Sequence, residues 1–221
     1  MRRLPFLCAL AFAASGCAGS HGLAGEACGG KVHERRSAEL ASIYDADQAD
    51  RADFTKMTLA AMLKMSRRDE RRIRRVAEIF AEGCLKTGKD YYHAAMVFQH
   101  GRSPDHFLQT YLWSSQAVAL GDDRGNWLRA AGVDRYLMNT GRKQLYATQA
   151  QGMGPGTDTC YCLWPLEETA TDEDRKAIGA RTLEEQWAWI DGMNKGKDCG
   201  RKFCPREAKP TPKGSLPGVN W

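Results

Sequence analysis

Residues 103–141 read SPDHFLQTYLWSSQAVALGDDRGNWLRAAGVDRYLMNTG. Ser103 followed by Pro104 predicts a helix start, because serine caps the first turn and proline fits the first helical position. This helix ends at Gly121, and a second helix, from about position 124, ends near Gly141. The stretch therefore predicts two consecutive helices.

The second of these helices shares a pattern with an earlier stretch. Residues 91–97 (YYHAAMV) align with residues 127–133 (WLRAAGV) at an offset of 36. Small alanines at a helix contact and a spacing near this length resemble tetratricopeptide and Sel1-like arrays, which normally need three or more repeats. We therefore predict a mainly α fold of antiparallel helical hairpins with tetratricopeptide/Sel1-like packing, in which one hairpin packs against a third helix.

Helical patterns also precede this region. They begin near Ala38, and apolar residues then recur at helical spacing: Phe54, Met57, Ala61 and Met65. Ser66 with Asp69 predicts the N-terminus of a further helix, and another helix spans residues 90–100. The arginines between positions 67 and 75 alternate with acidic residues, which favours a solvated helix face over a nucleic-acid site.

The pattern changes after Gly141. Residues 144–149 alternate in polarity, a turn-rich stretch follows, and residues 159–164 are rich in strand-forming types, which together predict a small β-hairpin. Two short helices come next, each with a capping box: Thr171 with Asp174, and Thr182 with Glu185. Residues 195–221 hold four prolines and predict an irregular, solvated tail.

The N-terminus resembles a bacterial secretory signal. Arg2 and Arg3 precede an apolar stretch that is too short to span a bilayer, and residues 14–17 (ASGC) resemble a lipoprotein lipobox. The resemblance implies cleavage after residue 16 and a lipid on Cys17; the alternative is an ordinary cleaved signal with an incidental cysteine. Ala18 in place of aspartate implies the outer membrane, facing the periplasm.

With this signal and lipid anchor, the chain is expected to have four parts. We expect a signal peptide at 1–16, a flexible tether at 17–37, a helical domain at 38–194 and a Pro/Lys-rich tail at 195–221. The formal net charge is +5, but the tail alone holds seven basic and two acidic residues. The domain is therefore not basic, and we expect no nucleic-acid partner.

Six cysteines remain once the leader and Cys17 are set aside: Cys28, Cys84, Cys160, Cys162, Cys199 and Cys204. An even number in an oxidising compartment predicts disulfides, although sequence cannot choose the connectivity. Cys160 and Cys162 are too close to bridge each other easily, and a Cys199–Cys204 loop would tie the tail. A zinc site is the alternative, but the chain contains no C-x-x-C pair.

An ordered set of motifs resembles bacterial domain-of-unknown-function family 6624. The motifs are Asp47-Gln48-x-x-Arg51, Gln99-His100, Asp134-Arg135, Gly141-x-x-Gln144-x-Tyr146-Ala147-Thr148-Gln149 and Arg175-x-x-x-Gly179. They cover roughly residues 47–190. The resemblance implies a fold and no activity. Ala147 stands where the family has glycine, which puts in doubt any backbone conformation there that needs a positive φ.

Six polar residues could converge, because helix ends and the start of the predicted β-hairpin are adjacent in the chain. They are His100, Asp134, Arg135, Gln144, Thr148 and Gln149. His100 with Asp134 would make a base and its orienting carboxylate, and Arg135 would hold an anion. The alternative, which the residue types favour, is a buried hydrogen-bond network that ties the hairpin to the helices. No serine or cysteine lies in a recognisable nucleophile motif.

Other candidate sites have less support. His93 and His100 share a helical face, with His106 and Asp105 just beyond, but this spacing does not complete a metal site. Four aromatic residues would suit sugar stacking, although helical spacing favours the core: Tyr91, Tyr92, Trp113 and Trp127. We expect no cofactor.

Two functional hypotheses follow. The first is a non-catalytic helical module, tethered to the envelope, that binds a protein or glycan partner. The second is an envelope hydrolase that uses a His100/Asp134 dyad. The second hypothesis requires the two side chains to lie about 3 Å apart, or one water apart, in an open cleft.

Overall fold

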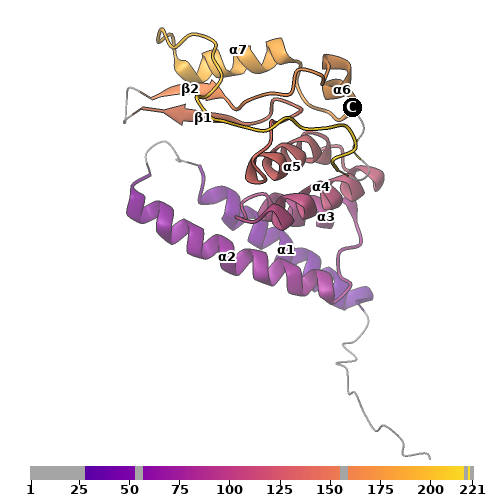
Figure 1. Ribbon diagram of the computed structural model, residues 1–221. Coiled ribbons are helices and arrows are strands. Elements are labelled where there is room, and N and C mark those ends of the chain that lie inside the picture. Colours follow the sequence, from indigo (N-terminus) through magenta and orange to yellow (C-terminus); the bar gives the residue numbers. More distant parts are fainter. Residues whose placement is uncertain (1–27, 53–56, 155–158, 217–218, 220–221) are drawn as a thin grey trace, which may run out of the picture.

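The computed structural model describes residues 28–52, 57–154, 159–216 and 219. These residues form seven α-helices and one antiparallel two-stranded hairpin near the C-terminal end (Figure 1). In chain order the elements are α1 (Gly30–Ala49), α2 (Leu59–Ala81), α3 (Gly88–Phe98), α4 (Pro104–Ala119), α5 (Gly125–Asn139), β1 (Ala150–Met153), β2 (Cys160–Leu163), α6 (Asp172–Ala177) and α7 (Leu183–Asn194). The prediction of a mainly helical chain with a small C-terminal β-hairpin is confirmed.

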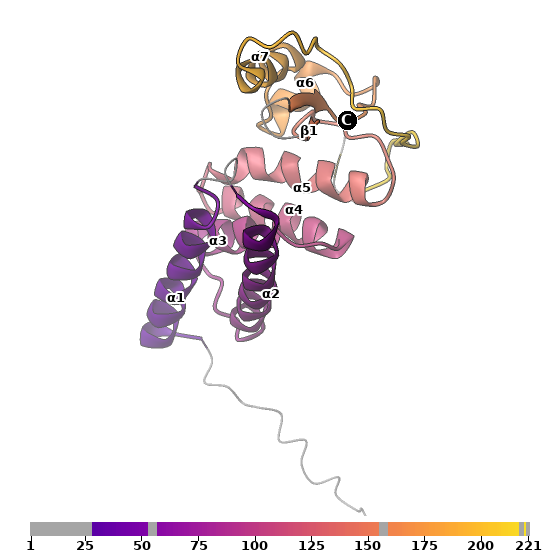
Figure 2. The same ribbon diagram turned by 90° about the vertical axis from the view of Figure 1, so that its left-hand side faces the viewer.

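The helix α4 packs against both α3 and α5. It runs antiparallel to α5, since Gly125 lies against Ser114 whereas Gly132 lies against Tyr111 and Phe107. The helices α1 and α2 lie on the other side of α3, and α5 separates this helical part from the β-hairpin with α6 and α7 (Figures 1 and 2).

Glycines set the close approach of α4 and α5. A Cβ at position 125 would lie 2.6 Å from the carbonyl oxygen of Ser114, and one at position 132 would lie 2.8 Å from the backbone nitrogen of Tyr111. Both distances are far below van der Waals contact, so the two backbones touch where a side chain would separate them. Ala130 and Ala131 beside them are fully buried.

Two helix starts differ from the sequence prediction. The helix α1 begins at Gly30, so residues 30–37 are helical where a tether was expected. The helix α2 begins after Thr58, whose hydroxyl accepts a hydrogen bond from the Ala61 amide, and it continues through Ser66. The prediction that Ser66 is an N-cap was wrong: its hydroxyl accepts from the Arg102 guanidinium instead. Phe54 lies outside the described residues.

The C-terminal part differs in two places. The first strand begins at Ala150, whereas residues 144–149 form an irregular loop. The tail is irregular but not solvated throughout, because Leu216 and Val219 are buried against Tyr146 and its neighbours. Backbone hydrogen bonds join this tail to the end of α5, among them Lys209 to Gly141 at 2.9 Å.

All six candidate cysteines form disulfides. The pairs are Cys28–Cys84, Cys160–Cys199 and Cys162–Cys204. The expected Cys199–Cys204 loop was wrong, because β2 holds the tail beside it: the Cys204 amide donates to the Leu163 carbonyl at 2.7 Å. Both tail cysteines are therefore bonded to cysteines of β2 and not to each other.

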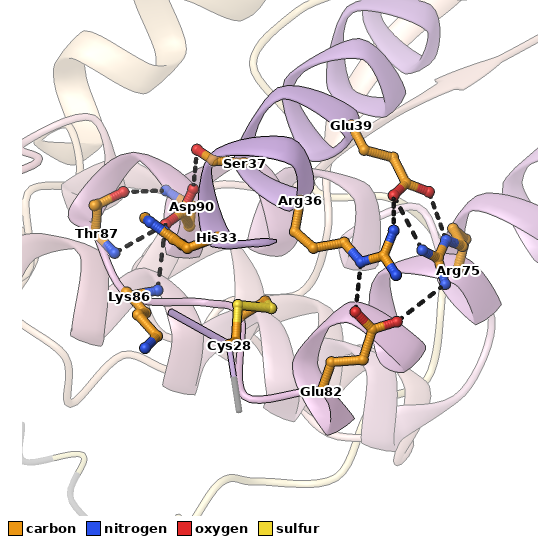
Figure 3. The surroundings of a disulfide bond; sticks show 11 residues. Cys28, His33, Arg36, Ser37, Glu39, Arg75, Glu82, Lys86, Thr87 and Asp90 are labelled. Carbon is orange, nitrogen blue, oxygen red and sulfur yellow. Dashed lines mark hydrogen bonds and ion pairs between the residues drawn. A yellow bond between two sulfur atoms is a disulfide. The ribbon is translucent and has the colours of Figure 1, made fainter. Parts of the chain in front are cut away.

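The carboxylate of Asp90 fastens the start of α1 to the start of α3 (Figure 3). It is 1 % exposed and accepts hydrogen bonds from Ser37 Oγ at 2.6 Å, the Thr87 amide at 2.9 Å and His33 Nε2 at 2.9 Å. Burial alone would raise the pKa of Asp90, but the bonds from Ser37, His33 and Thr87 outweigh it and lower the pKa to about 2.

We expect Asp90→Asn to lower the free energy of unfolding by about 2 kcal/mol at pH 7. A depressed carboxyl pKa stabilises the fold above the unfolded pKa, near 4, and this contribution disappears as the pH falls toward 2. Urea unfolding between pH 2 and 7 measures the effect. The wild-type and variant curves should converge at pH 2; a constant difference across this range would contradict the assignment.

Candidate functional site

The partly buried His100 ring and the buried Asp47 carboxylate form a pair where the C-terminal ends of α1 and α3 meet. His100 Nδ1 lies 3.0 Å from the Asp47 carboxylate, which is fully buried. Asp47 also accepts from Arg51 Nη1 at 2.9 Å and from Gln48 Nε2 at 2.8 Å. An ionised carboxylate only accepts, so Nδ1 of His100 carries the proton and Nε2 keeps its lone pair.

The surroundings of His100 keep its ring neutral. Burial lowers the pKa of His100, the Asp47 carboxylate opposes this shift, and the nearby Arg51 and Arg135 guanidinium groups add to it. A neutral imidazole with a free Nε2 at pH 7 is able to accept a proton.

A network of ion pairs holds Asp47 and Arg51 in place. Arg51 Nη2 donates to Asp69 of α2 at 2.7 Å, and Arg72 Nη1 donates to the other oxygen of Asp69 at 2.9 Å. On the neighbouring turn, Arg68 and Arg72 both bind Asp50. These bonds join α1 to α2, so the carboxylate that orients His100 is itself fixed.

A cleft of about 460 Å³ lies between α2 and the turn that joins α3 to α4. His100 lines it, together with Arg74 and Glu70 of α2 and with Arg102 and His106. The ring of His106 packs on Gly101, where a Cβ would lie 2.5 Å from its Cγ.

The imidazole of His106 has the opposite arrangement of donor and acceptor nitrogens. Its Nδ1 accepts from the backbone amides of Arg102 at 3.2 Å and Ser103 at 3.5 Å, as part of the capping box of α4. In the neutral ring the proton therefore lies on Nε2. The cleft thus has one histidine with a lone pair at Nε2 and one with an N–H there.

The expected His100/Asp134 dyad is not formed. Asp134 is fully buried in α5 and accepts from the amides of Leu145, Tyr146 and Thr148 at 2.8, 3.0 and 2.9 Å, and from Thr148 Oγ1 at 2.7 Å. Burial raises the pKa of this carboxyl, and the four hydrogen bonds act against the shift. Asp134 therefore fastens the loop after α5, and Asp47 is the carboxylate that meets His100.

Three of the four predicted ligand-binding residues belong to the same loop. Gln144 Nε2 donates to the carbonyls of Trp164 at 2.8 Å and Gln149 at 3.2 Å, and the Gln149 amide donates back to Gln144 Oε1 at 3.0 Å. Gln149 Nε2 also donates to Thr148 Oγ1. These contacts are those of a structural network, as the alternative interpretation of the sequence expected.

Arg135, the fourth predicted residue, lies near His100. Its Nη1 donates to the side-chain oxygen of Gln99, the residue that caps α3. Burial lowers the pKa of Arg135 to about 10, with Asp134 opposing and Arg51 adding to the shift. The motif residues at 47, 51, 99, 100 and 135 thus meet at one place.

Ala147 adopts a left-handed backbone conformation with φ 59°. Its methyl group is fully buried beside Leu163, Leu166, Trp187 and Ile190. The positive φ that the sequence put in doubt is therefore present with alanine, and packing of the methyl group offsets part of the backbone strain.

The remaining candidates are structural in their surroundings. Among the described residues, no group of three His, Cys, Asp or Glu side chains is placed to hold a metal. His93 stacks on Tyr44 at 4.3 Å, and burial lowers its pKa. Trp113 packs on Phe98 at 4.4 Å in the core, and Arg124 lies 4.2 Å over the Tyr92 ring. Asp105 and Trp127 remain exposed, the latter to 37 %.

Comparisons with protein families, with curated proteins and with solved structures gave no match. The resemblance to family 6624 therefore stays a prediction. Residues 1–27, with the expected signal and Cys17, lie outside the described residues. Within the described part of the chain, no helix is both long and apolar enough to span a bilayer.

Proposed function

We propose that this chain is a helical module, tethered to the bacterial envelope through a lipid on Cys17, that binds an acidic glycan in the cleft beside His100. The observation that carries the proposal is the cleft of about 460 Å³ with two histidines and two arginines in its lining. In this proposal α3, α4 and α5 serve as a tetratricopeptide-like scaffold that holds the cleft residues.

The lining suits a carboxylate on a polar ligand. Arg102 has a side chain that is 68 % exposed, and its partners among the described residues are the Ser66 hydroxyl and, at 3.8 Å, Glu70. Arg74 is exposed and has no ion pair among the described residues. A guanidinium binds a carboxylate through two parallel hydrogen bonds, and the N–H of His106 and the lone pair of His100 suit sugar hydroxyls.

We expect N-acetylmuramic acid to shift the ring resonances of His100 and His106, whereas N-acetylglucosamine, which lacks the carboxylate, shifts them little. Arg102→Gln should weaken the binding of the acidic sugar about tenfold, the loss of one charge-assisted contact. Arg201→Gln is the matched control, because Arg201 is exposed and binds Glu184 on α7. Equal responses to the two sugars would contradict the proposal.

A second candidate is a hydrolase, because the His100–Asp47 pair favours proton transfer. Nε2 of His100 would take a proton from water as the water oxygen attacks an ester carbonyl, and the N–H of His106 would donate a hydrogen bond to the developing oxyanion. The His100 imidazolium would then return the proton to the leaving oxygen. Activity toward p-nitrophenyl acetate that is lost in both His100→Gln and His106→Gln would support this candidate. Unchanged hydrolysis in either variant would exclude it.

A further inference from the structure

The six arginines of α2 fall into two sets. Arg68 and Arg72 bind Asp50 at the end of α1, and Arg75 binds Glu39 of α1. Arg67, Arg71 and Arg74 are exposed and have no hydrogen bond or ion pair within the part of the chain that the structure describes. The first set joins two helices; the second set has no such role.

The unpaired arginines form one basic stripe, which also contains Lys64. Positions 64, 67, 71 and 74 are separated by three or four residues and so lie on one side of the helix. Two exposed leucines extend the stripe toward the N-terminus: Leu63 is 55 % exposed and Leu59 is 74 % exposed.

Two acidic residues border the basic stripe. Glu78 binds Arg75 at 2.7 Å, and Glu70 has Arg102 at 3.8 Å. The four cations therefore outnumber the acids beside them, and the acids have other partners. The stripe is a positively charged face with an apolar end.

The N-terminal segment joins the domain at one end of this helix. Cys28 is bonded to Cys84, three residues beyond the end of α2 (Figure 3). Ten residues lie between Cys17 and Cys28, and the eleven Cα–Cα steps that join the two cysteines span at most about 40 Å. A lipid on Cys17 would hold the basic stripe within reach of the membrane surface.

We propose that the basic stripe of α2 docks on the anionic phospholipid headgroups of the leaflet that carries the lipid anchor. The guanidinium groups bind phosphates, and Leu63 with Leu59 enters the interface beneath them. The placement of the anchor rests on the proposed envelope tether, but the charge and apolar character of the stripe do not. Docking would lay α2 along the membrane.

The test uses the chain from Ala18 onward without a lipid, since this chain keeps every described element and all three disulfides. Vesicles of phosphatidylcholine with phosphatidylglycerol should bind it, whereas pure phosphatidylcholine vesicles should not. The variant Lys64→Gln/Arg67→Gln/Arg71→Gln should lower the partition constant about 100-fold. It spares Arg74, so a failure of the cleft proposal would not affect this result.

The control removes the same charge from the tail. Lys195, Lys202 and Lys209 are exposed, and their side chains have no partner within the described ranges, so their change to glutamine should leave binding nearly intact. Leu63→Gln should weaken binding about fivefold without a change in charge. An equal loss of vesicle binding in the tail variant would overturn the proposal in favour of general polyanion binding. An affinity for heparin in solution equal to that for the anionic vesicles would do the same. Thermal unfolding checks that each variant is folded.

Discussion

Replacing Asp134 with alanine is expected to lower the free energy of unfolding by about 4 kcal/mol, the largest effect that we predict for a single side chain. The carboxylate is fully buried and accepts from three backbone amides and one hydroxyl, all within residues 145–148. Its removal leaves these donors buried without an acceptor, and water cannot replace it unless the loop opens.

Urea unfolding followed by circular dichroism measures this effect. Asp134→Asn should cost less, about 2 kcal/mol, because the amide oxygen still accepts while its NH₂ group faces donors. Asp174→Ala is the surface control: Asp174 caps an exposed turn at Thr171, and its loss should cost about 1 kcal/mol. A loss below 1 kcal/mol in Asp134→Ala would show that this loop does not depend on the carboxylate.

Gly132→Ala is expected to destabilise the fold by about 3 kcal/mol although it adds only a methyl group. The new Cβ would lie 2.8 Å from the Tyr111 nitrogen and 3.1 Å from the Phe107 carbonyl oxygen, and both are backbone atoms of α4 that no rotamer change can move. The helices α4 and α5 must separate, which opens the core on both sides.

The same substitution at Gly192 should stabilise the fold. Gly192 lies in α7 without a positive φ, and apart from its chain neighbours and the adjacent backbone of α7 no atom lies within 4 Å of the position that a methyl group would take there. Alanine at this position therefore gains about 0.5 kcal/mol from helix propensity. Thermal unfolding of the two variants side by side separates packing from propensity. Similar melting temperatures for both would refute the close contact of α4 with α5.

The sequence motifs predicted the candidate site only in part. The sequence suggested that His100 and Asp134 converge, because helix ends and the start of the predicted β-hairpin are adjacent in the chain, but α5 directs Asp134 toward the loop at 145–148. Asp47 was part of the first motif, yet it lies 53 residues from its histidine, and nothing local indicates that pairing. The capping role of His106 was predictable from the sequence, because His106 lies three residues after the N-cap residue Ser103.

By itself, the sequence determined the features that arise within a few residues. The helix starts at Ser103, Thr171 and Thr182 were correct, because a cap is a contact between a side chain and an amide three positions away. The presence of a hairpin after α5 and the disulfide state of the six cysteines also followed from local patterns and from counting.

Tertiary structure alone decided which distant residues meet. Alternation at residues 144–149 favoured a strand, but hydrogen bonds to one buried carboxylate of α5 made it a loop. Cys160 and Cys162 form disulfides with Cys199 and Cys204 because backbone hydrogen bonds hold the tail beside β2. Such pairings depend on the mutual burial of segments far apart in the chain, and no short stretch of sequence records that energy.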